Sequence, residues 1–233
     1  MAKWRANIGL ISPAQSVAES AFNKYAPEGV EIATTRIKLK AFPTEPDDGF
    51  ITRLEAAAET FSELPKDIII FGCTVGSCIN GTGWDQECIR RMEERCHSRC
   101  TTTINACMES FDALGVKNIA MITPYPEYKT QIQKKFLEDH GYRITAVKIL
   151  DVQCFNGDVP QGFIYKQART MDLSNAEALF ISCMKLHTME IVEPLETDLG
   201  IPVISSHQAS LWSVLRRSGV NERMRGLGRL MEL

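Results

Sequence analysis

Two short apolar stretches that each end on a cysteine constrain this chain most. Residues 67–77, DIIIFGCTVGS, begin with a continuous run of β-branched and aromatic side chains, which is typical of a buried strand. The run ends at Cys73. Residues 178–185, ALFISCMK, repeat the pattern and contain Cys183. Because open α/β sheets bind ligands at the carboxyl ends of their strands, the two cysteines indicate a site with one thiol on each side.

Strand and helix signals alternate along the chain, which favours an α/β fold with parallel sheets. Hydrophobic patterns in the first part predict strands at 7–12 and 30–40 and helices at 17–26, 50–64 and 84–95.

The pattern then restarts. NIAMIT at 118–123 resembles NIGLIS at 7–12, and Cys183 occupies the place of Cys73. We therefore expect two pseudo-symmetric lobes that face each other across a cleft, which is a common position for a small-molecule site. The expected division is residues 1–116 for the first lobe, 117–220 for the second, and 221–233 for a tail packed on the first lobe.

Composition excludes several classes of protein. With 233 residues, of which 44% are hydrophobic and 24% charged, the chain can bury a sizeable core. A net charge of −3 and the lack of any basic run give no reason to expect a nucleic-acid partner. No apolar run approaches the roughly 18–20 residues that span a bilayer. The opening residues lack the apolar core of a signal peptide, so we expect a cytoplasmic protein without membrane partners.

The eight cysteines are expected to be reduced thiols, because disulfides belong mainly to secreted proteins. Cys96 and Cys100, with His97 between them, resemble half of a metal site. A zinc site needs about four ligands, and no second pair accompanies this one, so we expect no metal. Four further cysteines have no counterpart in the other half and are interpreted as structural or incidental: Cys78, Cys88, Cys107 and Cys154.

The glycine-rich loop at 76–83 does not match a nucleotide-binding motif. A Walker loop would need lysine where Thr82 stands, and a dinucleotide fingerprint would need glycine where Gln86 stands. We therefore expect no nucleotide cofactor. We expect the loop to let backbone N–H groups approach an anion, with hydroxyl donors from Thr74, Ser77 and Thr82.

Four other side chains are candidates for contact with a substrate, and each also has an ordinary structural explanation. Tyr125 is either a buried tyrosine with a satisfied hydroxyl or a donor that reaches the cleft. Asn156 is typical of a turn, and its amide is also suited to contact a substrate. His187 and His207 fall near the expected cleft, although a single histidine usually serves packing. Cys73 and Cys183 could likewise be buried apolar residues, but their matched positions favour catalysis.

These residues resemble the aspartate/glutamate racemase superfamily, and most closely the branch with maleate cis–trans isomerase and arylmalonate decarboxylase. The similar segments cover most of the chain, and the last of them is the most specific. They are GCTVGS with the later GTGWD, ALGVKNIAMITPYP, FNGDV, and residues 182–216. The resemblance implies two pseudo-symmetric α/β lobes with the active site between them, and a homo-oligomer.

The resemblance also implies roles for individual residues. Cys73 and Cys183 would be the catalytic pair, and Tyr125 and Asn156 would bind substrate. Arylmalonate decarboxylases replace the first cysteine, so the presence of Cys73 favours an isomerase or racemase. Further substrate-binding residues implied by the resemblance are Thr74 and Ser77 in the first cysteine motif, and Gln15.

Three positions depart from the maleate isomerase pattern. Gln15 stands where asparagine is usual, His207 stands where asparagine is common, and Phe155 replaces an aspartate. All three are expected around the substrate, so they leave the two-thiol chemistry intact and the identity of the substrate open.

Two opposed thiols can act without a cofactor. A cysteine pKa near 8.5 allows one sulfur to remove a proton and the other to return it, or a thiolate to add to a C=C bond. Both routes pass through an enediolate-like anion that loop amides and hydroxyls can stabilise. We therefore expect a cofactor-independent isomerase or racemase of a small mono- or dicarboxylic acid. The alternatives are an arylmalonate-type decarboxylase that protonates through Cys183, and a non-catalytic carboxylate-binding or thiol-sensing protein.

Overall fold

A computed structural model describes residues 5–39, 49–152 and 158–233 of the chain. Strands and helices alternate as the sequence predicts, and the predicted elements of the first part are all present, although the helix expected at 50–64 ends at Glu59. In chain order the elements are β1 (Ala6–Pro13), α1 (Ala18–Tyr25), β2 (Val30–Ile37), α2 (Phe50–Glu59), β3 (Ile68–Phe71), α3 (Trp84–Cys96), β4 (Cys100–Thr102), α4 (Thr103–Ala113), β5 (Asn118–Thr123), α5 (Glu127–Asp139), β6 (Arg143–Ile149), α6 (Gln161–Arg169), β7 (Ala178–Ile181), α7 (Met189–Leu199), β8 (Val203–Ser205), α8 (Ser206–Arg217) and a final 3-10 turn, η1 (Arg229–Glu232).

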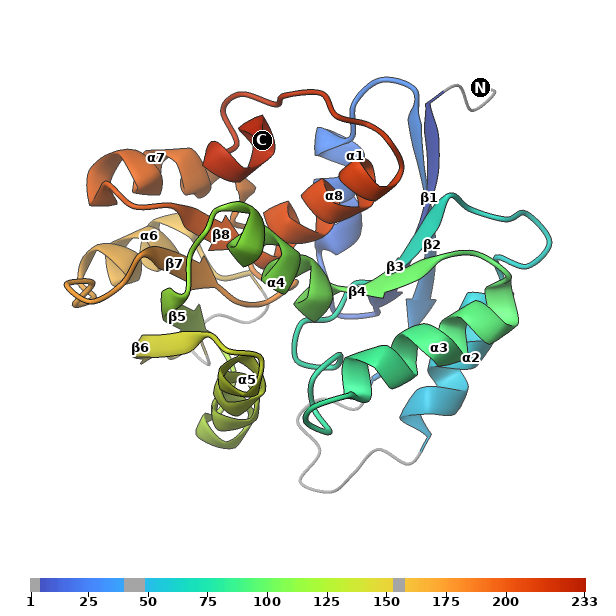
Figure 1. Ribbon diagram of the computed structural model, residues 1–233, viewed down its shortest axis with the longest axis horizontal. Coiled ribbons are helices and arrows are strands. Elements are labelled where there is room, and N and C mark those ends of the chain that lie inside the picture. The colour runs from blue at the N-terminus through green and yellow to red at the C-terminus, as the bar shows by residue number, and fades with distance from the viewer. Residues whose placement is uncertain (1–4, 40–48, 153–157) are drawn as a thin grey trace.

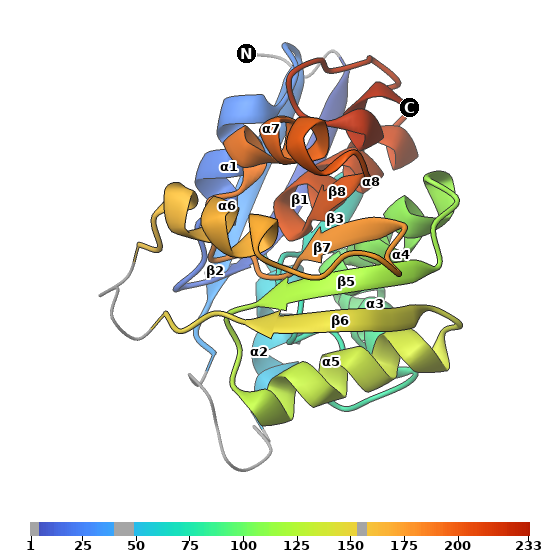
Figure 2. The same cartoon turned by 90° about the vertical axis from the view of Figure 1, so that its left-hand side faces the viewer.

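The strands form two parallel four-stranded sheets with the same order, β2-β1-β3-β4 and β6-β5-β7-β8 (Figures 1 and 2). Every side chain of β3 and of β7 is buried, because helices cover both faces of each sheet. The expected α/β fold of two pseudo-symmetric lobes is therefore confirmed. Within the part of the chain that is described, no helix is both long and apolar enough to cross a membrane.

The last helix of each half packs on the sheet of the other half. Phe111 of α4 lies in one apolar cluster with Phe180 of β7, and their rings are 5.2 Å apart. Val214 of α8 lies in another cluster with Leu10 of β1. As Figure 1 shows, α4 and α8 lie side by side between the two sheets. This exchange buries the two halves against each other and fixes how their strand ends meet.

The C-terminal tail packs over α8 and α7. Leu227 belongs to the apolar cluster that joins α8 to the first sheet, and its carbonyl oxygen accepts a hydrogen bond from Gln208 Nε2 at 2.6 Å. The Arg229 N–H donates to the Glu196 carboxylate at 2.8 Å. The expected boundaries at residues 116 and 220 stay a prediction, because α4 and α8, which precede them, each pack on the sheet of the other lobe.

The backbone after β7 is strained at Cys183. Its φ of 144° lies in the region that favours glycine, whereas the residue carries a side chain. The neighbouring Ser182 N–H donates to the Ile122 oxygen at 2.8 Å, which anchors the segment to β5. Such a conformation costs on the order of 1–3 kcal/mol and persists only where its surroundings hold it.

Replacing Cys183 by glycine should therefore leave a more stable protein than replacing it by alanine. Both variants lack the thiol, so the difference reports the backbone alone. We expect Cys183→Gly to exceed Cys183→Ala by about 1 kcal/mol, after the entropy that glycine loses on folding is deducted. Urea unfolding of both variants measures the difference, and an alanine variant of equal or greater stability would show that the backbone is unstrained.

Candidate active site

Cys73 lies two residues beyond β3 and is partly buried by the loop that follows it. A Cβ on Gly76 would come within 2.8 Å of the Cys73 sulfur, so only glycine allows the loop to fold this closely over the thiol. The Ser77 N–H and hydroxyl both return to the Cys73 carbonyl oxygen, at 3.1 Å and 2.8 Å. These two hydrogen bonds close a tight turn around the Cys73 sulfur.

Cys183 occupies the matching position beyond β7 and is 8% exposed. The Lys185 N–H donates to its sulfur at 3.3 Å. The Gly76 N–H makes the corresponding contact with Cys73. Each sulfur therefore receives a backbone N–H from its own loop, an arrangement that favours a thiolate.

The two thiols lie close enough to interact electrostatically. Burial raises the pKa of Cys73 to about 12, and the Cys183 thiol adds to this, while the Gly76 N–H and the Lys129 ammonium oppose it. Burial also raises the pKa of Cys183, against the Tyr125 hydroxyl and the Lys185 N–H. Since each negative sulfur disfavours the other, the loss of a proton from one thiol opposes its loss from the second.

Tyr125 connects the Cys183 thiol to the first cysteine loop. It follows β5, is 7% exposed, and hydrogen-bonds through its hydroxyl with Cys183 and with Thr74. Burial and the two thiols raise the pKa of Tyr125 well above its usual value. The hydroxyl therefore keeps its proton and is available as a donor to an anion.

Ser206, which the sequence analysis missed, contacts both thiol-bearing loops. The Thr74 hydroxyl donates to Ser206 Oγ at 2.9 Å, and the Cys183 N–H donates to the same atom at 3.1 Å. The available sequence signal is the Ser205–Ser206 pair, which lies where β8 meets α8, since a helix start needs only one serine as its cap.

Lys129 is a second residue that sequence reasoning missed. It lies in the first turn of α5, shortly after Tyr125, and is 7% exposed. Burial lowers the pKa of Lys129, and attraction to the Cys73 thiol partly offsets this effect. A buried ammonium beside this thiol suits the binding of a carboxylate. A lysine soon after the candidate tyrosine was the signal that could have identified it.

The other predicted substrate-binding residues occupy different surroundings. Ser77 is buried, and its hydroxyl donates to the Cys73 and Thr74 carbonyl oxygens, so it is used in the turn. Gln15 is exposed in the loop after β1, next to Ser16, whose hydroxyl donates to the Met184 oxygen. Asn156 lies outside the described residues. The structure thus brings Cys73, Cys183, Thr74 and Tyr125 together, with the Gln15 loop alongside.

Three of the remaining described cysteines lack the backbone N–H contacts of the two strand-end thiols. Burial raises the pKa of Cys78, Cys88 and Cys107 as it does for Cys73 and Cys183, but no backbone N–H or ammonium is among the main groups that act on these three sulfurs. The sulfurs of Cys96 and Cys100 lie 3.5 Å apart. Among the described residues, no three His, Cys, Asp or Glu side chains form a group that could hold a metal ion.

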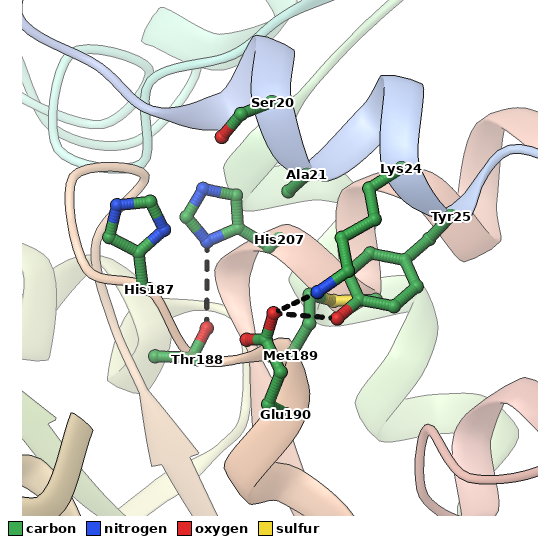
Figure 3. Close-up of a pocket in the computed structure, with 9 residues that line it drawn as sticks. All are labelled: Ser20, Ala21, Lys24, Tyr25, His187, Thr188, Met189, Glu190 and His207. Carbon is green, nitrogen blue, oxygen red and sulfur yellow. Dashed lines mark hydrogen bonds and ion pairs between the residues drawn. The ribbon is translucent and has the colours of Figure 1, made fainter.

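A pocket of about 240 Å³ lies between α1, the start of α7 and the start of α8 (Figure 3). The Lys24 ammonium and the Tyr25 hydroxyl both donate to the Glu190 carboxylate at 2.7 Å on one side of it. His207 is 1% exposed, and its Nδ1 lies 3.5 Å from the Thr188 hydroxyl. Burial, helped by the nearby His187, lowers the pKa of His207 to about 4, so the ring is neutral at pH 7.

The buried neutral His207 should make the protein sensitive to mild acid. Its pKa is near 6.5 in the unfolded chain and about 4 in the folded one. The unfolded state therefore binds more protons in this window, and stability falls as pH falls. We expect a loss of about 2 kcal/mol between pH 7.5 and pH 5 from this residue. Urea unfolding at both pH values should show a smaller loss for His207→Asn, and an equal loss would contradict the assignment.

Comparison with known proteins places this geometry in a family. The family model described as arylmalonate decarboxylase matches residues 8–231. A maleate isomerase from Nocardia farcinica is 24% identical over 237 residues, which cover 96% of this chain and 94% of that protein. An arylmalonate decarboxylase from Bordetella bronchiseptica is 24% identical over 197 residues, which cover 79% of this chain and 80% of the relative.

Solved structures share the fold. A glycine-to-cysteine mutant of arylmalonate decarboxylase superposes with a TM-score of 0.87 at 23% identity, over 97% of this chain and 100% of the other. A cysteine-to-serine mutant of the Nocardia farcinica maleate cis–trans isomerase, with a covalently bound succinylcysteine intermediate, has a TM-score of 0.84 at 23% identity, over 97% and 98% of the two chains. The family match spans both sheets and both cysteine loops, and this chain belongs to the arylmalonate decarboxylase family.

Proposed function

We propose that this protein is a cofactor-independent cis–trans isomerase of a small unsaturated dicarboxylic acid of the maleate type. The observation that carries the proposal is the pair of electrostatically coupled thiols at the ends of β3 and β7. Two further observations support it. Maleate isomerases are among the relatives that match most of this chain, and one of them was captured as a covalent succinylcysteine.

In the proposed reaction Cys73 acts as nucleophile and Cys183 as acid, then base. The Cys73 thiolate adds to one alkene carbon, and the π electrons move toward the neighbouring carboxylate to give an enediolate. Cys183 delivers its proton to the other carbon, which yields a saturated thioether. After rotation about the new single bond, Cys183 removes a proton and the carbon–sulfur bond breaks. Both sulfurs return to their starting states, so the step consumes nothing.

The substrate carboxylates are proposed to bind around Tyr125 and Lys129, with the backbone of Thr74 beside them, because the Thr74 hydroxyl donates to Ser206. Tyr125 supplies a proton donor at Cys183, and Lys129 supplies a positive charge at Cys73. Gln15, in the loop after β1, remains a proposed contact, and so does Asn156. For Ser77 we propose a supporting role, because its hydroxyl is engaged with the turn. Buried donors of this kind stabilise an enediolate more strongly than water does.

Decarboxylation of a malonate-type acid is the second candidate. It is favoured by the family match and by the Bordetella bronchiseptica relative. In this reaction an enediolate forms by loss of carbon dioxide, and Cys183 alone protonates it. Proton transfer between the two faces of an amino acid, as in a racemase, would use both thiols without forming a carbon–sulfur bond.

Proton NMR in D2O separates these functions with one panel of substrates. The panel contains maleate, both enantiomers of aspartate and glutamate, and phenylmalonate. Fumarate formed from maleate supports the proposal, whereas deuterium at an α-carbon indicates a racemase. Phenylacetate formed from phenylmalonate indicates a decarboxylase. If none of these compounds reacts, the proposed isomerase is wrong for this substrate class.

Loss of either thiol should abolish isomerisation. We expect Cys73→Ala and Cys183→Ala each to lower kcat/KM by at least about 1000-fold, because each removes a group that makes or breaks a bond. Cys96→Ala, at the opposite end of the first sheet, is the control and should retain activity within about threefold. Maleate consumption followed by absorbance gives the rates. Activity within tenfold of wild type in either variant would contradict the paired-thiol mechanism.

Lys129 should select substrates with a second carboxylate. Lys129→Gln removes a buried positive charge, so we expect KM for the dicarboxylate to rise at least about tenfold, because hydrogen bonds to charged groups contribute roughly 1.5–3 kcal/mol. The matched control is Lys134→Gln on the same helix, where the lysine pairs with Glu138 near solvent. Initial rates over a range of substrate concentration give KM. Equal KM values in both variants would remove Lys129 from the proposed site.

A further inference from the structure

Ser206 joins the two thiol-bearing loops through a single oxygen atom. Its Oγ accepts one hydrogen bond from the Cys183 N–H at 3.1 Å and another from the Thr74 hydroxyl at 2.9 Å. Thr74 follows Cys73 directly, so this oxygen connects the ends of β3 and β7, which belong to different sheets. Ser206 and Thr74 are both at most 1% exposed, and water does not compete with these bonds.

The start of α8 explains why this hydroxyl is available. Ser205 is the N-cap of the helix, and it shares a capping box with Gln208. The helix therefore does not need the Ser206 side chain for its own first turn. Because α8 follows β8 of the second sheet yet packs on the first, its first residue lies where the two sheets meet.

Both acceptor sites of the Ser206 hydroxyl are used. Its oxygen accepts from two donors, and its proton lowers the pKa of the Cys107 thiol. A hydroxyl offers two acceptor sites, and Ser206 is 0% exposed, so no acceptor site faces a substrate. Any contribution of Ser206 to the reaction must therefore act through the residues that it holds.

What Ser206 holds is the strained backbone of Cys183. The N–H of this residue points at Ser206 Oγ while its φ stays at 144°. Without the acceptor, the peptide at Cys183 is free to relax toward an ordinary conformation, and its sulfur would move with it. The Thr74 hydroxyl would lose its acceptor at the same time.

We propose that Ser206 is a positioning residue, whose hydroxyl fixes the position of the Cys183 thiol relative to the first cysteine loop, which it holds through Thr74. This inference rests on the proposed two-thiol function. It differs from a general structural role because it predicts a change in the chemical step without a matching change in substrate affinity.

Kinetics of Ser206→Ala test the proposal. We expect kcat to fall about 100-fold with KM changed less than about threefold, because small displacements of reacting groups have effects of this size. Ser206→Thr keeps the hydroxyl and should stay within about tenfold of wild type. Ser213→Ala is the matched control, since Ser213 is also buried on α8 but donates to Glu109 instead. An equal loss in Ser213→Ala, or kcat unchanged in Ser206→Ala, overturns the proposal.

Thiol reactivity supplies a readout that does not depend on turnover. Iodoacetamide labelling, with mass spectrometry of the Cys183 peptide, should be at least about fivefold faster in Ser206→Ala, because the loop over the thiol is no longer held. Labelling of Cys96 should not change. If wild type converts no substrate, the proposed function fails, while this comparison still decides the role of Ser206. An unchanged Cys183 rate overturns it.

A second variant covers the case in which Ser206→Ala does not fold. Ser206→Cys keeps nearly the same size but offers sulfur, a much weaker acceptor. We expect at least about a tenfold loss of kcat and faster labelling of Cys183, with the same melting temperature as wild type within a few degrees. Wild-type kinetics and labelling in this variant would show that the acceptor oxygen is not required.

Discussion

The burial of α4 and α8 between the two sheets is the constraint on which the site depends. Each helix ends one half of the chain and covers the sheet of the other half, so each sheet needs a helix from the other half to bury one of its faces. Apolar side chains of both helices pack on the sheets, and hydrogen bonds such as that from Ser213 to Glu109 join the helices, which sets one sheet against the other. The ends of β3 and β7 are thereby brought together, and each of them leads into a cysteine loop.

Burial also defines the chemistry of the two thiols. Removing Cys73 and Cys183 from water disfavours their ionised forms and raises both pKa values. Backbone N–H groups, the Tyr125 hydroxyl and the Lys129 ammonium act in the opposite direction. Because a negative charge on one sulfur disfavours a negative charge on the other, the loss of one proton opposes the loss of the second, which suits a reaction on opposite faces of one substrate. Ser206 completes the arrangement, because its hydroxyl oxygen contacts both loops.

Much of the architecture was predictable because it is local. Continuous apolar runs identify strands that are buried on both faces, and the recurrence of such a run before Cys73 and before Cys183 predicts two similar lobes. The roles of Ser77 and Thr74 were harder to foresee. Both carry hydroxyls in the same loop, yet one turns back on its own backbone and the other reaches Ser206. Sequence shows the residue type and leaves open which partner its hydroxyl meets.

The sequence by itself determined the alternation of strands and helices and the two strand-end thiols, because these follow from periodicity and short motifs, and its motifs carried the resemblance to the family. Only the tertiary structure decided that α4 and α8 exchange sheets, that Lys129 lies buried beside Cys73, and that Ser206 joins the two loops. The physical reason is the distance along the chain. Ser206 and Thr74 are separated by 132 residues, and their contact exists only once both sheets and the helices between them have packed.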